Sequence, residues 1–144
     1  MSDFSQTTLA LYPHPTPVQF NPIANVDLVP GTPVFQLVSD DTPGEVGKAK
    51  GAAGLFACVG FTALPGVATK RVRTQFIGPL TLTEDLWAAV NADSENLQTG
   101  LTYYLSGATA GKITKTRPDT FKVPVGVALS PDTLLIIPGS RLDA

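Results

Sequence analysis

The side chains that could carry out catalysis are few in this sequence and lie far apart. His14 is its one histidine and Cys58 its one cysteine. His14 stands between two prolines, distant in sequence from any candidate acid, whereas Ser-His-Asp and Cys-His catalysis needs a histidine held against its partners. Cys58 lies in the apolar run at 55–59, which is typical of a buried, unreactive thiol. We therefore expect no catalytic residue and no enzyme activity.

Metal and phosphate chemistry has no better candidates. One His and one Cys cannot form a zinc site, and no string of carboxylates has the spacing of a calcium loop. The adjacent carboxylates Asp40-Asp41 and Glu84-Asp85 suit a loop and a helix N-terminus. The glycine-rich run at 47–54 lacks the Gly-Lys-Ser/Thr order of a phosphate-binding loop. We expect no metal site and no cofactor.

The basic residues Lys70, Arg71 and Arg73 form one cluster. The formal net charge is −2, so the chain as a whole does not attract nucleic acid. The cluster also lacks the interleaved aromatics of a single-strand binding site. We expect a structural face or an ion pair with a neighbouring subunit, which makes Arg71 and Arg73 candidate exposed contacts.

Three aromatic residues, Trp87, Tyr103 and Tyr104, could form a patch that binds a sugar or a partner protein. Such residues more often pack in the core or at sheet edges. We expect core packing for Trp87 and for one of the two tyrosines, and we take Tyr104 as the candidate exposed contact.

The composition favours an all-β domain. The chain has 144 residues, of which only 15% are charged and 43% are apolar, with 13 Gly and 13 Pro. One compact domain with a real core fits this length. No signal peptide and no apolar run long enough for a membrane span are visible, so we expect a soluble protein made in the cytoplasm.

Residues 1–25 are expected to form an extended N-terminal arm. Pro13, Pro15, Pro17 and Pro22 disfavour a helix or a central strand there. Solvated tails are polar, yet this segment carries many apolar side chains. It either lies on another surface, of its own oligomer or of a partner, or packs irregularly on its own domain. The candidate binding residues are Phe4, Leu9, Leu11, Tyr12, Val18, Phe20 and Ile23.

The body, residues 26–144, reads as short strands separated by turns. Strands are expected at 34–38, 55–64 and 70–78, the last with one solvent-exposed face carrying Arg71 and Arg73. Thr83 followed by Glu84 and Asp85 predicts a short helix near residues 84–91. Four further runs between residues 99 and 138 predict a small up-and-down β unit.

The two halves of the body contain similar sequence segments in the same order. The segment Gly31-Thr-Pro-Val-Phe-Gln-Leu-Val-Ser parallels Gly100-Leu-Thr-Tyr-Tyr-Leu-Ser, and Val59-Gly-Phe-Thr-Ala-Leu-Pro parallels Val125-Gly-Val-Ala-Leu-Ser-Pro. We therefore expect a pseudo-repeat of 26–80 and 97–138, connected by the helix. The predicted fold is a small β-barrel or sandwich-like domain of two related β units.

Residues 80–138 resemble a known module. The resemblance runs in order through Leu82-Thr-Glu-Asp-Leu-Trp-Ala-Ala-Val, Leu97-Gln-Thr-Gly-Leu-Thr-Tyr-Tyr-Leu-Ser, Gly111-Lys-Ile-Thr, Val125-Gly-Val-Ala-Leu-Ser and Thr133-Leu-Leu-Ile. This order is similar to a β module of tailed-phage virion proteins, notably capsid decoration (cement) proteins and head-fibre bases. The first half resembles the same proteins more loosely. The resemblance implies a barrel-like fold without enzymatic activity on the outside of a capsid.

The expected function is that of a virion structural protein, which binds the outer surface of a phage capsid and stabilises its lattice. No coiled-coil or collagen-like repeat follows residue 138, which favours a compact decoration protein over a fibre. The expected partners are the major capsid protein and further copies of this chain in a dimer or trimer, without nucleic acid or membrane. The alternatives are a tail, baseplate or fibre-base component, and a surface glycan-binding module that uses Trp87 or Tyr104.

Overall fold

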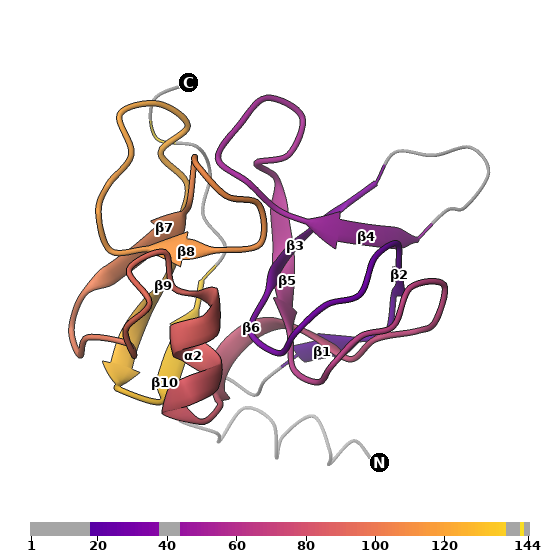
Figure 1. The fold of residues 1–144 in the computed structure, drawn as a ribbon, viewed down its shortest axis with the longest axis horizontal. Coiled ribbons are helices and arrows are strands. Elements are labelled where there is room, and N and C mark those ends of the chain that lie inside the picture. The colour runs from indigo at the N-terminus through magenta and orange to yellow at the C-terminus, as the bar shows by residue number, and fades with distance from the viewer. Residues whose placement is uncertain (1–17, 38–43, 138–141, 143–144) are drawn as a thin grey trace, which may run out of the picture.

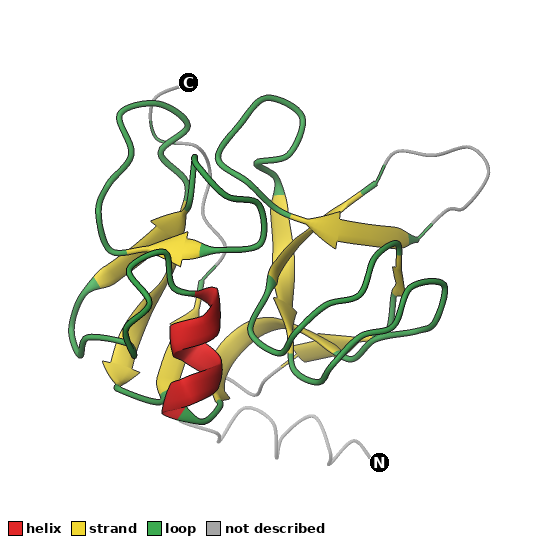
Figure 2. Ribbon diagram, in the orientation of Figure 1, coloured by secondary structure: helices red, strands yellow, loops and turns green. Residues whose placement is uncertain are grey.

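The computed structural model describes residues 18–37, 44–137 and 142. These residues form ten strands and one helix (Figure 1; Figure 2). The elements, in chain order, are β1 (Val18–Phe20), β2 (Ile23–Ala24), β3 (Pro33–Gln36), β4 (Glu45–Lys48), β5 (Cys58–Thr62), β6 (Thr74–Thr81), α2 (Glu84–Val90), β7 (Thr102–Leu105), β8 (Ile113–Thr114), β9 (Pro124–Ser130) and β10 (Thr133–Ile136).

The prediction of an all-β fold is confirmed. The strands of the described residues form one sheet in the order β2-β4-β3-β5-β6-β10-β9-β7-β8, and β1 pairs with β6 beside this path. The sheet is mixed, because β2 pairs with β4 in parallel whereas the other strands pair antiparallel. The path runs from β2 to β8 without joining these two strands, so the sheet is open and does not close into a barrel.

Strand β6 belongs to two sets of strands. Its residues 74–77 pair with β5 and β1, and its residues 78–81 pair with β10. We call β1–β5 with the first half of β6 the N-terminal half-sheet, and the second half of β6 with β7–β10 the C-terminal half-sheet. Figure 1 shows the two half-sheets on either side of β6.

The change of partners along β6 coincides with a local distortion at Gly78 within the continuous strand, which we call the break in β6. Gly78 has a φ of 100°, and Pro79 has no N–H to donate. The buried side-chain amide of Gln75 donates to the carbonyl oxygens of Ile77, Gly78 and Pro79 at 3.4, 3.0 and 2.8 Å. One glutamine therefore supplies hydrogen bonds to the carbonyl groups at the break.

The helix begins and packs largely as its sequence predicts. Thr83 is the N-cap, and its hydroxyl accepts a hydrogen bond from the N–H of Leu86 at 3.3 Å. Trp87 and Val90 are buried, whereas Leu86 is only half-buried. The indole N–H of Trp87 donates to the carbonyl oxygen of Asp132 at 2.8 Å, which fastens the helix to the turn between β9 and β10.

The two half-sheets share one strand order. The N-terminal half-sheet contains β4-β3-β5-β6, and the C-terminal half-sheet contains β8-β7-β9-β10. The simple up-and-down arrangement expected for the last four strands is wrong, because β9 pairs with β7 and leaves β8 at the end of the path. The same crossing occurs in the first half, where β5 pairs with β3 and β4 lies outside.

Corresponding residues of the two halves adopt the same local geometry. Gly31 and Gly100 have φ values of 85° and 86°. The N–H of Gly31 donates to the carbonyl of Thr62, and the N–H of Gly100 donates to the carbonyl of Ala128, both at 2.7 Å. These are the glycines that open the two similar sequence segments.

A second pair of glycines occupies equivalent crowded positions. A Cβ atom on Gly60 would lie 2.6 Å from the carbonyl oxygen of Gln75, and one on Gly126 would lie 2.5 Å from that of Leu135. Backbone atoms of the neighbouring strand fill the place of a side chain in both cases. Gly60 faces Val34 across the sheet as Gly126 faces Tyr103.

The apolar interior consists of two clusters of unequal size. The larger cluster takes residues from both half-sheets and the helix, including Phe61, Trp87, Tyr103, Leu105 and Ile136. The smaller cluster, which we call the minor core, belongs to the N-terminal half alone. Its members are Ala24, Leu28, Val34, Val46 and Val72, with Val59 packed against them.

Three segments differ from the predicted boundaries. The strand predicted at 55–64 is shorter and spans only Cys58–Thr62. Residues 18–20 and 23–24, which were assigned to the arm, are the strands β1 and β2 of the sheet. The strand predicted at 70–78 begins only at Thr74. Before it, Arg71 pairs with Ile23 in a single isolated bridge, which is too short to count as a strand. Residues 1–17 lie outside the described residues.

Candidate functional site

Of His14 and Cys58, the two residues considered for catalysis, only Cys58 lies in the described part of the chain. His14 lies outside the described residues. Cys58 is half-buried, and its thiol lies 3.5 Å from the carbonyl oxygen of Gly60. Burial raises the pKa of Cys58 to about 12, so the thiol stays protonated and weakly nucleophilic near neutral pH. No group of three or more His, Cys, Asp or Glu side chains able to hold a metal ion occurs in the described part of the chain.

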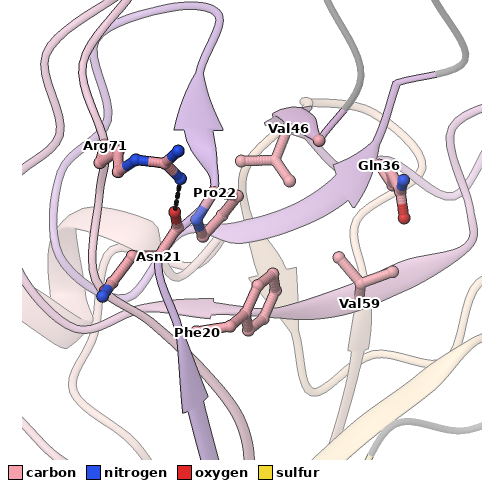
Figure 3. A pocket seen from close by; sticks show the side chains of 8 residues that line it. Phe20, Asn21, Pro22, Gln36, Val46, Val59 and Arg71 are labelled. Carbon is pink, nitrogen blue, oxygen red and sulfur yellow. Dashed lines mark hydrogen bonds between the residues drawn. The ribbon is translucent and has the colours of Figure 1, made fainter.

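The N-terminal half-sheet carries an apolar groove beside β1. Two adjoining hollows, each of about 370 Å³, share the residues Phe20, Gln36 and Val59. Figure 3 shows the side chains of Phe20, Val46 and Val59 around the same space. We call this feature the β1 groove, and its main lining residues are Phe20, Pro22, Gln36, Val46, Val59 and Phe76.

The β1 groove has an apolar floor and a polar rim. Val46 belongs to the minor core and Val59 packs against it, so the floor of the groove is one side of that cluster. Phe76 projects from β6 with 43% of its surface exposed. At the rim, the Arg71 guanidinium donates from Nη1 to the carbonyl oxygen of Asn21 at 2.8 Å (Figure 3). Such a surface suits an apolar chain segment better than a charged small molecule.

A second exposed apolar surface lies on two paired loops. The N–H of Leu28 donates to the carbonyl of Gly66, and the N–H of Gly66 donates to the carbonyl of Leu28, at 3.0 and 2.8 Å. Large apolar side chains point outward from both loops. We call this surface the loop patch, and its residues are Val26, Val29, Leu64 and Val67.

The loop patch continues into a hollow at the start of the helix. This hollow has a volume of about 640 Å³ and is lined mainly by apolar residues, among them Pro30, Leu64, Leu82 and Leu86. Asp132 lies at its polar side. Hydrogen bonds from the hydroxyl groups of Ser130 and Thr133 lower the pKa of Asp132, so its carboxylate is ionised at neutral pH.

The candidate arm residues fall into two groups. Phe4, Leu9, Leu11 and Tyr12 lie outside the described residues. Val18 is the first residue of β1, Phe20 is half-buried in the β1 groove, and Ile23 is half-buried in β2.

The other candidate contacts are not brought together into one site. Arg71 and Arg73 are exposed, with Val72 buried between them. Tyr103 and Trp87 are fully buried, as expected for core residues, and Tyr104 is half-buried. Burial removes Trp87 from any surface aromatic patch.

Of the residues that line the β1 groove, sequence reasoning had singled out only Phe20 and Arg71, and it missed the others, among them Gln36, Val46, Val59 and Phe76. Val59 and Phe76 were interpreted only as members of strands. Which face of those strands stays open depends on where β1 and β2 lie, and this placement is set by pairings distant in sequence. The sequence did contain one signal for an exposed apolar surface. Phe76 is apolar, and it lies in a strand that was expected to expose one face to solvent.

Comparison with known proteins found no matching family model, no matching curated protein and no matching solved structure. Within the described residues, no helix has the length and apolar character needed to cross a membrane.

Proposed function

We propose that this protein is a non-enzymatic decoration protein that binds the outer surface of a phage capsid and stabilises its lattice. The observation that carries the proposal is β1. This edge strand joins the all-β body to the preceding residues, among which are Phe4, Leu9, Leu11 and Tyr12. A body with its own core and a preceding segment that carries several large apolar side chains is suited to joining neighbouring subunits, because an extended segment can add to another surface through its backbone and side chains.

The surface of the body supports the same proposal. The loop patch and the β1 groove expose apolar side chains that a monomer gains nothing by exposing. Contacts of this kind with the major capsid protein or with neighbouring copies would each be modest. Many of them repeated over a lattice give strong attachment through avidity.

The decisive experiment is a copy-number measurement. Quantitative mass spectrometry of purified virus particles gives the ratio of this protein to the major capsid protein. We expect a ratio near one per capsid subunit or one per local symmetry axis. A few copies per particle would instead indicate a tail, baseplate or fibre-base component, and absence from the particle would contradict the proposal.

The role of the N-terminal segment needs a separate variant. Deletion of residues 2–17 leaves β1 and β2 intact, whereas a longer deletion would remove strands of the sheet. We expect the shortened protein to keep its thermal transition and to lose binding to particles that lack the wild-type protein. Unchanged binding of the shortened protein would assign attachment to the body alone.

A further inference from the structure

We propose that the hollow at the start of the helix binds an arginine or lysine side chain of a partner protein, together with the apolar side chains beside it. This inference deepens the proposed function, because it states the chemistry of the capsid segment that the body would hold. It rests on that function for the identity of the partner, but not for the chemistry of the contact.

The hollow combines an apolar lining with a single charged side chain. Its volume is about 640 Å³, and most of the residues that line it are apolar. Among the described residues of this lining, Asp132 alone is charged, and there is no Lys or Arg. Glu84 and Asp85 follow the lining residue Thr83 and add two carboxylates to the first turn of the helix. The complementary occupant is therefore a positively charged group with apolar neighbours.

Hydroxyl groups hold the carboxylate of Asp132 in place. Its Oδ1 atom accepts hydrogen bonds from the hydroxyls of Ser130 and Thr133 at 2.6 and 3.0 Å. Because Thr133 gives its one hydroxyl proton to Asp132, the hydroxyl of Thr81 donates to that of Thr133, at 2.8 Å. Thr81 also lines the hollow, so the network connects the wall of the hollow to the carboxylate.

The backbone of Asp132 is fixed as well. Its carbonyl oxygen accepts from the N–H of Leu82 at 3.0 Å and from the indole N–H of Trp87 at 2.8 Å. A ligand would therefore not have to order this carboxylate when it binds. Among the described residues, no side chain donates to the second carboxylate oxygen, Oδ2. This oxygen can accept from the N–H of an ammonium or guanidinium group.

A protein segment suits the hollow better than a free small molecule does. The hollow is continuous with the loop patch, because Leu64 belongs to both. Val29 and Val67 of this patch are 51% and 58% exposed. Sites for small molecules bury most of the ligand surface, whereas this apolar surface extends beyond the hollow. A chain segment can place a basic side chain at Asp132 and its apolar neighbours on the loop patch.

The test uses the full-length protein and three short peptides, without virus particles. The peptides are acetyl-Leu-Arg-Leu-amide, acetyl-Leu-Gln-Leu-amide and acetyl-Gly-Arg-Gly-amide. The variant is Asp132→Asn, which keeps an oxygen acceptor for the two hydroxyls and loses the charge. The matched control is Asp119→Asn, because Asp119 is exposed between β8 and β9 and does not line the hollow. NMR titration gives the affinity and the amides that shift, and thermal unfolding checks each fold.

We expect acetyl-Leu-Arg-Leu-amide to shift the amides of Leu64, Leu82 and Leu86, with a dissociation constant of about 1–10 mM. The wild-type protein and Asp119→Asn should bind this peptide equally, and Asp132→Asn should bind it at least about threefold more weakly. The glutamine peptide should bind all three proteins alike, and more weakly than the arginine peptide binds the wild-type protein. The glycine peptide should also bind more weakly, because it lacks the apolar side chains.

Four results would overturn the proposal. Three of them are no shift at the hollow at peptide concentrations of about 10 mM, equal wild-type affinity for the arginine and glutamine peptides, and equal binding by Asp132→Asn and Asp119→Asn. The fourth is an equal loss of both leucine peptides in Asp132→Asn, which would mean that Asp132 only shapes the hollow.

No particle is present in this test, so none of its results depends on the decoration function. Absence of the protein from virus particles would contradict the proposed function and leave the peptide result unchanged. Failure of the contact and failure of the decoration function are therefore distinguishable.

Discussion

At the scale of single residues, Gln75 illustrates how one buried amide holds a break in a strand. Its side chain is 2% exposed and donates to the carbonyl oxygens of residues 77, 78 and 79. An acceptor in the same place would face these oxygens without a proton to share. The position therefore requires a donor rather than simply a polar group.

Replacement of Gln75 should destabilise the fold, and the loss of stability should depend on whether the new side chain can donate a hydrogen bond. We expect Gln75→Met to lower the free energy of unfolding by about 1–3 kcal/mol, because carbonyl groups at the break lose their partner. Gln75→Glu should be worse at pH 7, where the new carboxylate is charged and faces the same oxygens. Urea denaturation at pH 7 measures both effects.

The stability of the Gln75→Glu variant should also depend on pH. Burial beside carbonyl oxygens should raise its folded-state pKa above the unfolded value of about 4.3. The folded state then binds the proton more tightly, so stability is highest below the unfolded pKa and falls as the pH rises through the folded pKa. Denaturation at pH 4 and pH 7 should show a smaller deficit at pH 4. An equal deficit would mean that donor chemistry is not the cause.

Single-residue expectations from the sequence succeeded where burial follows from residue type. Trp87 and Tyr103 are in the core, as expected for large aromatics. The role of Gln75 could not be predicted. Its partners exist only because β6 breaks at Gly78, and that break reflects a change of neighbouring strands.

At the scale of elements, two glycines lie where the backbone of a neighbouring strand leaves no room for a side chain. Gly60 on β5 and Gly126 on β9 hold equivalent positions, each with a carbonyl oxygen where a Cβ would lie. A backbone atom cannot move aside as a side-chain end can. The neighbouring strand must shift if either glycine acquires a side chain.

Gly126→Ala should therefore destabilise the C-terminal half-sheet. We expect a loss of about 1–3 kcal/mol, typical of overpacking against a rigid neighbour. Gly107→Ala is the matched control, because a Cβ there would meet its nearest atom at an ordinary 3.5 Å. Thermal unfolding of the two variants should separate them clearly. Similar transition temperatures would show that β10 can yield at Leu135.

Local elements were largely predictable from the sequence, but their pairing was not. The Thr83 cap and the acidic first turn predicted the helix, and the turn residues predicted where the last four strands begin and end. The pairing of β9 with β7 was missed, because it joins segments separated by β8 and its flanking loops. Turn chemistry fixes where a strand ends but not which distant strand lies beside it.

At the scale of the whole molecule, exposed apolar side chains gather on particular surfaces. The loop patch combines residues from two loops that pair through Leu28 and Gly66. Neither this patch nor the β1 groove is visible in the sequence. Each needs segments distant in sequence to be placed side by side, Leu28 beside Gly66 for the patch and Phe20 beside Thr74 for the groove.

The loop patch supplies a prediction tied to the decoration function. Combined Leu64→Asp and Val67→Asp substitutions should weaken binding to particles at least about tenfold, since charged groups would have to be desolvated at the interface. Leu129→Asp, at a similarly exposed position on β9, should bind normally. Cosedimentation with particles that lack the wild-type protein measures both. Equal binding by the two variants would remove the patch from the interface.

The sharing of β6 has a consequence for how the molecule unfolds. Neither half-sheet retains its full hydrogen-bond ladder if this strand leaves, because β1 and β5 depend on its first half and β10 on its second. The larger apolar cluster also draws on both halves. The two similar units are therefore not independent folding domains, and the body should melt in a single cooperative transition. A mechanical load applied to one half is carried directly into the other along a continuous chain.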